Sequence, residues 1–192
     1  MKHLPMLAAL LPRWRAFLLG RVSQGCAPET PVKFEPEHAG DDRKGLVSAD
    51  DVLLDVVVAS KHELLAEIAG HMESVHEMDA RSVELALAHR ERIASTALGE
   101  GVAIPHARVS GLRQVRSMYV RLRFPIPFDA PDGQPVTHVL VLLVPKEATQ
   151  RHLEILAEAA QALGDRRLRE ALRHCSDTKD VVRLLGGASQ GH

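Results

Sequence analysis

Residues 137–144 read T-H-V-L-V-L-L-V and are almost continuously apolar. A short apolar run rich in valine and leucine is typical of a strand buried on both faces of a sheet. Such a strand requires a covering layer against each face, because an uncovered face would expose apolar side chains to water. This run therefore predicts a layered domain that contains both helices and strands.

The segments around this run alternate between helical and extended patterns. Ser60 to Glu63 form a capping-box pattern, which predicts a helix over residues 61–75. Asp79 can cap a second helix that brings Arg90 to its C-terminal end. The apolar face expected for the first helix consists of Leu64, Leu65, Ile68, Met72 and Val75.

Residues 117–124 alternate apolar and polar side chains, as a strand with one covered face would. Three further helices are expected over residues 150–163, 165–173 and 177–185. Helices and strands interleaved in this order imply a layered α/β domain.

The length of 192 residues suits one domain and an extension, and 45% hydrophobic residues suffice for one core. We expect a flexible extension over residues 1–45 and the domain over residues 46–188. The extension contains several prolines and a charged stretch at residues 40–45, which are typical of linkers. Its alternatives are a secretory signal or a short basic amphipathic helix at residues 13–21. Its apolar run at residues 4–11 is too short to span a bilayer, so no stable membrane insertion is expected.

The charges exclude some partners. The chain has 24 basic and 25 acidic residues, which leaves no net field to attract nucleic acid or anionic membranes.

Cys26 and Cys175 do not form a CxxC pair, and a reduced cytoplasmic protein is the simplest fit. The sequence contains no GxxxxGK[ST] loop, no HExxH and no paired Cys/His spacing, so we expect no nucleotide or metal cofactor.

Residues 90–108 read R-E-R-I-A-S-T-A-L-G-E-G-V-A-I-P-H-A-R and place His106 behind a Gly-x-Gly turn and a Val-Ala-Ile-Pro step. Neutral imidazole is nucleophilic and abundant at neutral pH, so histidine is well suited to accept and pass on a phosphoryl group. Pro105 favours an extended conformation at Ile104, and His106 should therefore leave a strand end on a stiff base. The glycines should let the backbone come close to whatever docks there.

This segment resembles the active-site signature of the mannitol/fructose-type (type 2) EIIA domains of the bacterial phosphotransferase system. A second matching element, L-L-V-P-x-x-x-x-x-x-H-L, covers residues 142–153, and the resemblance extends over residues 46–185. The resemblance implies a central mixed sheet flanked by helices on both faces. It also implies that His106 is the phosphoryl acceptor, with Arg90 near it and His152 beside it.

The residue types agree with those roles. A planar guanidinium at Arg90 can hold the three oxygens of a phosphoryl group in transfer. If Thr149 caps a helix, His152 lies in the first turn, where the helix dipole disfavours the imidazolium and keeps the ring neutral. Ser95 and Thr96 either order the loop or bond to phosphate, and we favour ordering. Arg108 faces either the phosphoryl group or an acidic rim of a partner.

The chain shows no EIIB cysteine motif and no fused carrier, and it resembles the nitrogen-regulatory branch, EIIANtr. The resemblance implies a donor of the HPr type (NPr), and as targets a potassium transporter or a sensor kinase. Two alternatives remain open. One is a sugar-specific EIIA that passes the group to an EIIB, and the other is a binding module that is never phosphorylated.

Overall fold

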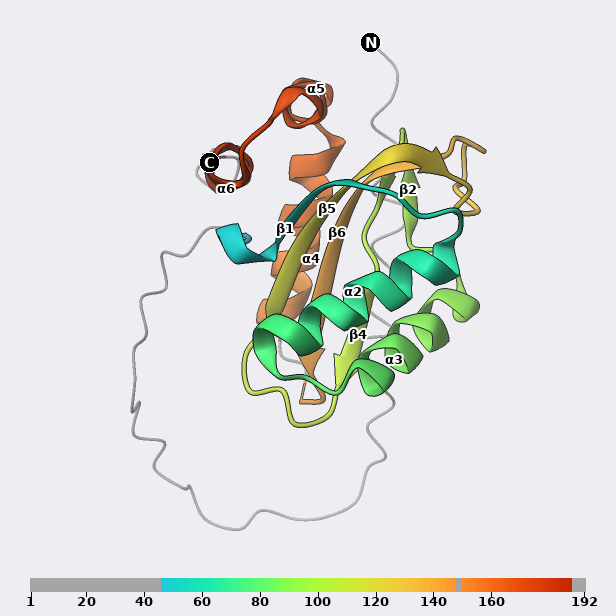
Figure 1. Cartoon of the computed structure of the whole chain (residues 1–192), viewed down its shortest axis with the longest axis vertical. Coiled ribbons are helices and arrows are strands. Elements are labelled where there is room, and N and C mark those ends of the chain that lie inside the picture. Colours follow the sequence, from blue (N-terminus) through green and yellow to red (C-terminus); the bar gives the residue numbers. More distant parts are fainter. Residues whose placement is uncertain (1–45, 148–149, 188–192) are drawn as a thin grey trace. The chain divides into compact units, whose positions relative to one another are not determined.

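A computed structural model describes residues 46–147 and 150–187. They form a six-stranded mixed sheet with helices on both faces, which confirms the predicted fold class (Figure 1). The predicted extension, residues 1–45, lies outside the described residues. The elements are η1 (Ala49–Asp51), β1 (Val52–Val56), α2 (Lys61–His76), α3 (Ala80–Ile93), β2 (Ala97–Gly99), β3 (Val102–Ala103), β4 (His106–Val109), β5 (Arg116–Ile126), β6 (Val136–Pro145), α4 (Gln150–Gly164), α5 (Arg166–His174) and α6 (Thr178–Gly187).

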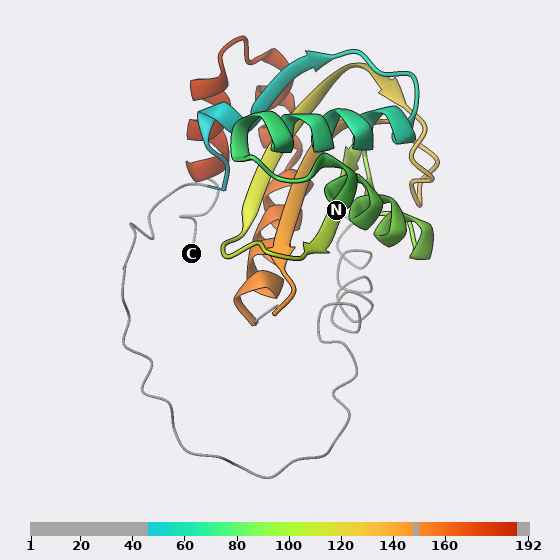
Figure 2. The ribbon, with the colours of Figure 1, turned by 60° about the horizontal axis from the view of Figure 1, so that its bottom comes forward.

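Strand β6 is the centre of the sheet. It pairs antiparallel with β5 on one side and parallel with β3 and β4 on the other. Helices α2 and α3 lie over one face of the sheet and α4 over the opposite face, as Figures 1 and 2 show. Every residue of β6 except the half-buried Thr137 is buried, which confirms the strand predicted from the apolar run.

The two helices on the first face begin where the capping patterns predict. Ser60 accepts a hydrogen bond from the Glu63 amide at 3.2 Å, and the Glu63 carboxylate accepts one from the Ala59 amide at 2.8 Å. Asp79 caps α3 by accepting from the Ser82 amide at 2.9 Å. Of the apolar face expected on α2, Val75 is the exception, because the last turn extends beyond the core and leaves it 42% exposed.

The single covered face predicted for residues 117–124 is wrong. Strand β5 lies between β1 and β6 and is covered on both faces, so that Tyr119 and Arg121 are buried as fully as their apolar neighbours. The Tyr119 hydroxyl lies 2.7 Å from Nδ1 of His138 on β6. Phe124, expected on the covered face, is 59% exposed because it lies beyond the residues of β5 that pair with β1.

Arg121 is buried because it completes the end of a helix. Its Nη1 donates to the carbonyl oxygens of Leu172, Arg173 and Cys175 at 2.9, 3.1 and 2.5 Å. Its Nη2 pairs with Asp55 of β1 at 3.0 Å. The last carbonyls of a helix have no partner within the helix, so this guanidinium supplies the donors that α5 needs and attaches it to the sheet.

Arg121→Met should destabilise the protein by about 2 kcal/mol or more, because several carbonyl groups would lose their donor. Arg123→Met is the matched control, since Arg123 lies two residues along the same strand and is exposed. It should change stability by less than about 0.5 kcal/mol. Urea unfolding of both variants tests this, and equal midpoints would contradict the role given to Arg121.

Candidate functional site

A break in one strand creates the site. Strands β3 and β4 continue one line of pairing along β6, with Val102 opposite His138 and His106 opposite Leu142. The line is interrupted at Ile104 and Pro105, where proline has no amide hydrogen to donate. His106 is therefore the first residue of β4, directly after the break.

The hydrogen bonds of His106 determine which ring nitrogen carries the proton. Nδ1 lies 2.9 Å from the carbonyl oxygen of Ile104, which can only accept, so Nδ1 is the protonated nitrogen. Nε2 then has a lone pair, and it accepts a hydrogen bond from Nε of Arg90 at 3.1 Å. The ring is thus fixed as the neutral tautomer with its basic nitrogen turned toward Arg90.

The surroundings of His106 keep it uncharged. The side chain is 1% exposed, and burial together with the positive charge of Arg90 lowers its pKa to about 4. The bond to the Ile104 carbonyl opposes this shift only in part. At neutral pH the imidazole is therefore in its nucleophilic form.

Arg90 reaches the histidine from the last turn of α3. Its Nη1 donates to the carbonyl oxygen of Ala94 at 2.8 Å, a bond that satisfies the end of the helix. Burial lowers the pKa of the guanidinium and the negative charge of Glu91 opposes that shift, yet an arginine remains charged in proteins. A buried cation thus lies beside a buried neutral base.

The glycines before His106 form a tight turn, and a segment of the same chain comes close to it. Gly99, Glu100 and Gly101 have φ values of 97°, 52° and 77°, the left-handed conformations of a tight turn between β2 and β3. A side chain at Gly99 would meet Asp132 at 3.0 Å, and the Asp132 carboxylate accepts from the Glu100 amide at 2.6 Å. The segment that approaches this turn is therefore the chain's own loop after β5.

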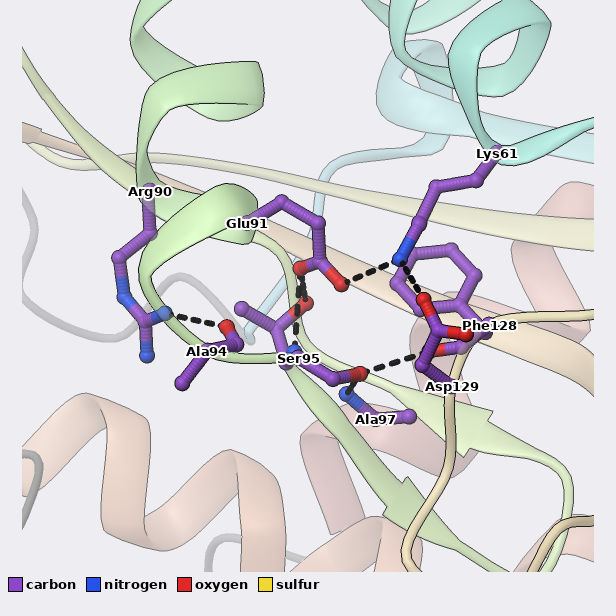
Figure 3. A network of polar contacts seen from close by, with 9 residues as sticks. Lys61, Arg90, Glu91, Ala94, Ser95, Ala97, Phe128 and Asp129 are labelled. Carbon is purple, nitrogen blue, oxygen red and sulfur yellow. Dashed lines mark hydrogen bonds and ion pairs between the residues drawn. The ribbon is translucent and has the colours of Figure 1, made fainter.

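Ser95 and Thr96 connect α3 to β2, and their hydroxyl groups are both engaged. Ser95 Oγ donates to the Phe128 carbonyl at 2.6 Å and accepts from the Ala97 amide at 3.2 Å (Figure 3). Thr96 Oγ1 donates to Oε2 of Glu91 at 2.6 Å and is 2% exposed as a residue. These contacts order the loop.

Arg108 and His152 lie within electrostatic reach of each other. Arg108 is two residues beyond His106 on β4, hence on the same face, and its buried Nε and Nη2 have no hydrogen-bond partner among the described residues. His152 is the third residue of α4 and is 8% exposed. Burial and the charge of Arg108 lower the pKa of His152. Its expected cap, Thr149, lies outside the described residues.

The sequence reasoning missed two charged residues at the site, Glu91 and Lys61. Glu91 is buried, follows Arg90 directly and bonds to Thr96, while Lys61 bonds to Glu91 at 3.0 Å. The signal that could have found Glu91 was an acidic residue directly after the candidate arginine in the last turn of a predicted helix. Within residues 46–147 and 150–187, no three His, Cys, Asp or Glu side chains are grouped to hold a metal ion. None of the helices in these two ranges could span a membrane.

Comparison with known proteins identifies the family of this domain. Residues 46–187 match the family model of the phosphoenolpyruvate-dependent sugar phosphotransferase system, EIIA 2. A nitrogen regulatory protein of Bradyrhizobium diazoefficiens is 36% identical over 140 residues, which cover 73% of this chain and 92% of that protein. A fructose-specific EIIA component of Haloferax volcanii is 31% identical over 123 residues, 64% of this chain and 79% of that protein. The crystal structure of the nitrogen regulatory protein IIA-Ntr from Neisseria meningitidis superposes with a TM-score of 0.70 at 38% identity, covering 73% of this chain and 96% of that one.

Nitrogen-15 NMR should find His106 in the Nδ1–H tautomer with a titration midpoint of about 4, well below the ordinary 6.5. Arg90→Met should raise that midpoint, because it removes a neighbouring positive charge. The unfolded chain binds the proton near pH 6.5 while the folded state resists it, so His106 contributes a loss of stability as the pH falls from about 6.5 toward 4. A midpoint near 6.5 would contradict the electrostatic description of the site.

Proposed function

The chain belongs to the EIIA 2 family of the phosphoenolpyruvate-dependent sugar phosphotransferase system, and on that premise we propose that Nε2 of His106 accepts a phosphoryl group from the phosphohistidine of an HPr-type carrier. One observation carries this proposal. The bond from Nδ1 to the Ile104 carbonyl leaves the lone pair on Nε2, and Nε2 is the nitrogen that Arg90 contacts. A nucleophile and a phosphate-binding cation thus meet at one atom.

The transfer needs no metal and no nucleotide at this site. The Nε2 lone pair attacks phosphorus, the phosphorus–nitrogen bond of the carrier breaks, and its electron pair stays on the carrier's imidazole. Nε–H of Arg90 exchanges its bond to Nε2 for bonds to the phosphoryl oxygens, whose negative charge spreads over three atoms in the loose transition state. Nδ1–H remains bonded to Ile104, which stabilises the positive charge that the ring gains.

The remaining predicted residues support this step in our proposal. Arg108 offers unpaired guanidinium donors on the His106 face of β4, and burial keeps the pKa of His152 low, so that its neutral ring can donate a hydrogen bond to the phosphoryl group. Ser95 and Thr96 order the loop between Arg90 and His106, since their hydroxyl groups bond to Phe128 and Glu91.

Within the family, the chain is a phosphocarrier of the nitrogen-regulatory type. Both the Bradyrhizobium protein and the Neisseria structure carry nitrogen regulatory names, and the fructose-specific relative is more distant. We therefore propose that NPr is the donor, that the protein acts in the cytoplasm, and that the phosphoryl group serves as a signal to targets such as a potassium transporter or sensor kinase. The sugar-specific alternative predicts transfer to an EIIB.

Incubation with phosphoenolpyruvate, enzyme I and an HPr-type carrier should label the full chain at His106, with the acid lability of a phosphoramidate. His106→Ala should abolish the label. Arg90→Ala and His152→Ala should slow labelling by about 10²-fold, the scale of losing one preorganised donor. The controls are Arg92→Ala and His62→Ala, both exposed, which should label at the normal rate. Full labelling of His106→Ala would refute the proposed acceptor.

Phosphorylation should also select the binding partners. It adds about 1.5 to 2 negative charges beside Arg90 and Arg108, which changes what can dock without refolding the core. We expect a regulatory target to bind the unphosphorylated form more tightly. Affinity capture with unphosphorylated and enzymatically phosphorylated protein measures this, with His106→Ala as the control that cannot change state. Equal recovery of every partner by both forms would favour the sugar-relay alternative.

A further inference from the structure

A buried carboxylate, Glu91, lies next to Arg90 in sequence and close to the pair formed by Arg90 and His106. The Glu91 side chain is 5% exposed and follows Arg90 in the last turn of α3. Its Oε2 accepts from the amide and the hydroxyl of Thr96 at 3.0 and 2.6 Å. Its Oε1 accepts from Nζ of Lys61 at 3.0 Å. A carboxylate with three donors is fully engaged in holding its surroundings in place.

Lys61 anchors this carboxylate to a second part of the fold. Its Nζ also donates to Oδ2 of Asp129 at 2.8 Å and lies 4.9 Å from the centre of the Phe128 ring (Figure 3). Lys61 is the first residue of α2, while Phe128 and Asp129 follow β5. Two carboxylates raise the pKa of Lys61 despite its partial burial, so it is charged at neutral pH. The end of α3 is thereby tied to both α2 and the loop after β5.

Glu91 is linked to His106 through hydrogen bonds and to the acceptor of Arg90 through the backbone of the same loop. Glu91 holds Thr96, whose carbonyl oxygen accepts from the Ile104 amide at 3.0 Å. The Ile104 carbonyl in turn accepts from Nδ1 of His106. On the other side, Ala94, two residues before Thr96, accepts from Nη1 of Arg90. One loop thus fixes the acceptors for Arg90 and, through Ile104, for His106.

We infer that Glu91, with Lys61 as its counter-ion, is a positioning residue for phosphoryl transfer: it holds Thr96 and thereby fixes Arg90 and the tautomer of His106. This inference rests on the function proposed above. Glu91 contacts neither the phosphoryl group nor the carrier in the proposed transfer. It acts through the geometry of the loop, and its negative charge also favours the charged form of the neighbouring Arg90.

The Lys61–Glu91 pair orders the loop at a cost in free energy, because the Glu91 side chain is almost fully buried and the Lys61 side chain is partly buried. Taking the Glu91 carboxylate out of water costs free energy that an apolar side chain would not cost, so the pair is weak evidence for stability. What the pair supplies is a single arrangement of donors and acceptors, which a reaction that depends on orientation requires.

The test combines kinetics with the state of the histidine ring in the full-length protein. Glu91→Gln keeps the size of the side chain but replaces one acceptor oxygen by a donor and removes the charge. We expect it to lower kcat with a phosphorylated HPr-type carrier by about 10²-fold, the scale of a small displacement of reacting groups. KM should stay nearly unchanged, because Glu91 is buried. Nitrogen-15 NMR should show His106 as a mixture of tautomers.

Two further variants keep the test decisive if Glu91→Gln does not fold. Thr96→Val removes the hydroxyl bond and should reproduce both effects in weaker form, whereas Thr96→Ser keeps the hydroxyl and should behave as wild type. Glu84→Gln, a more exposed glutamate on the same helix that pairs with His62, is the matched control. It should leave kcat and the tautomer unchanged.

The inference is overturned if folded Glu91→Gln, or Thr96→Val in its place, keeps the wild-type kcat and a single Nδ1–H tautomer. It is also overturned if kcat falls while the tautomer stays fixed, since the loss would then not pass through His106. The NMR measurement requires no phosphorylation. Failure of the wild-type protein to accept phosphate would therefore refute the proposed function, while the NMR spectra of the variants would still show whether Glu91 fixes the tautomer of His106.

Discussion

The hydrogen bond between Nδ1 of His106 and the carbonyl of Ile104 lies at the break between β3 and β4, where Pro105 interrupts the strand that runs beside β6. The Pro105 carbonyl accepts from the Leu142 amide of β6, while the Ile104 carbonyl, which points to the other side of the strand, accepts from the imidazole. Burial of the ring strengthens this choice of tautomer, because it excludes the water that would otherwise compete. The backbone carbonyl of Ile104 thus fixes the tautomer in which Nε2 of His106 carries the lone pair.

Arginines that donate to carbonyl oxygens at the ends of helices recur in this domain, and Arg90 is one of them. Arg121 and Arg169 each donate to carbonyls at the end of a helix, α5 and α4 respectively, and each also pairs with a carboxylate, Asp55 or Glu100. Arg90 does the same for the end of α3 through Ala94, but its Nε donates to His106. A recurrent way of ending a helix thereby places a cation at the nucleophile. The acceptor for that arginine lies in the loop that Glu91 and Lys61 hold.

Much of the fold and of the candidate site was predictable from the sequence, because the patterns that indicate them are local. The apolar run of β6 and the capping patterns of α2 and α3 are local signals, and the structure confirms them. A strand was expected to end before His106, where β3 lies, but the short strands β1, β2 and β4 were not predicted, because three to five residues carry too little periodicity and depend on their neighbours in the sheet. The burial of Tyr119 and Arg121 was missed for a related reason, because it depends on residues distant in sequence: Tyr119 bonds to His138 of β6 and Arg121 to the end of α5. The pairing of Arg90 with His106 joins residues 16 apart in sequence, so the motif could indicate it but spacing alone could not.

The structure turns one nitrogen of one histidine, Nε2 of His106, toward Arg90 with its lone pair available. The most direct test labels the histidines with nitrogen-15, phosphorylates the full chain enzymatically and measures nitrogen–phosphorus coupling. We expect coupling to Nε2 of His106, with the proton still on Nδ1 and bonded to the backbone. Coupling to Nδ1 of His106, or to any other histidine, would contradict it.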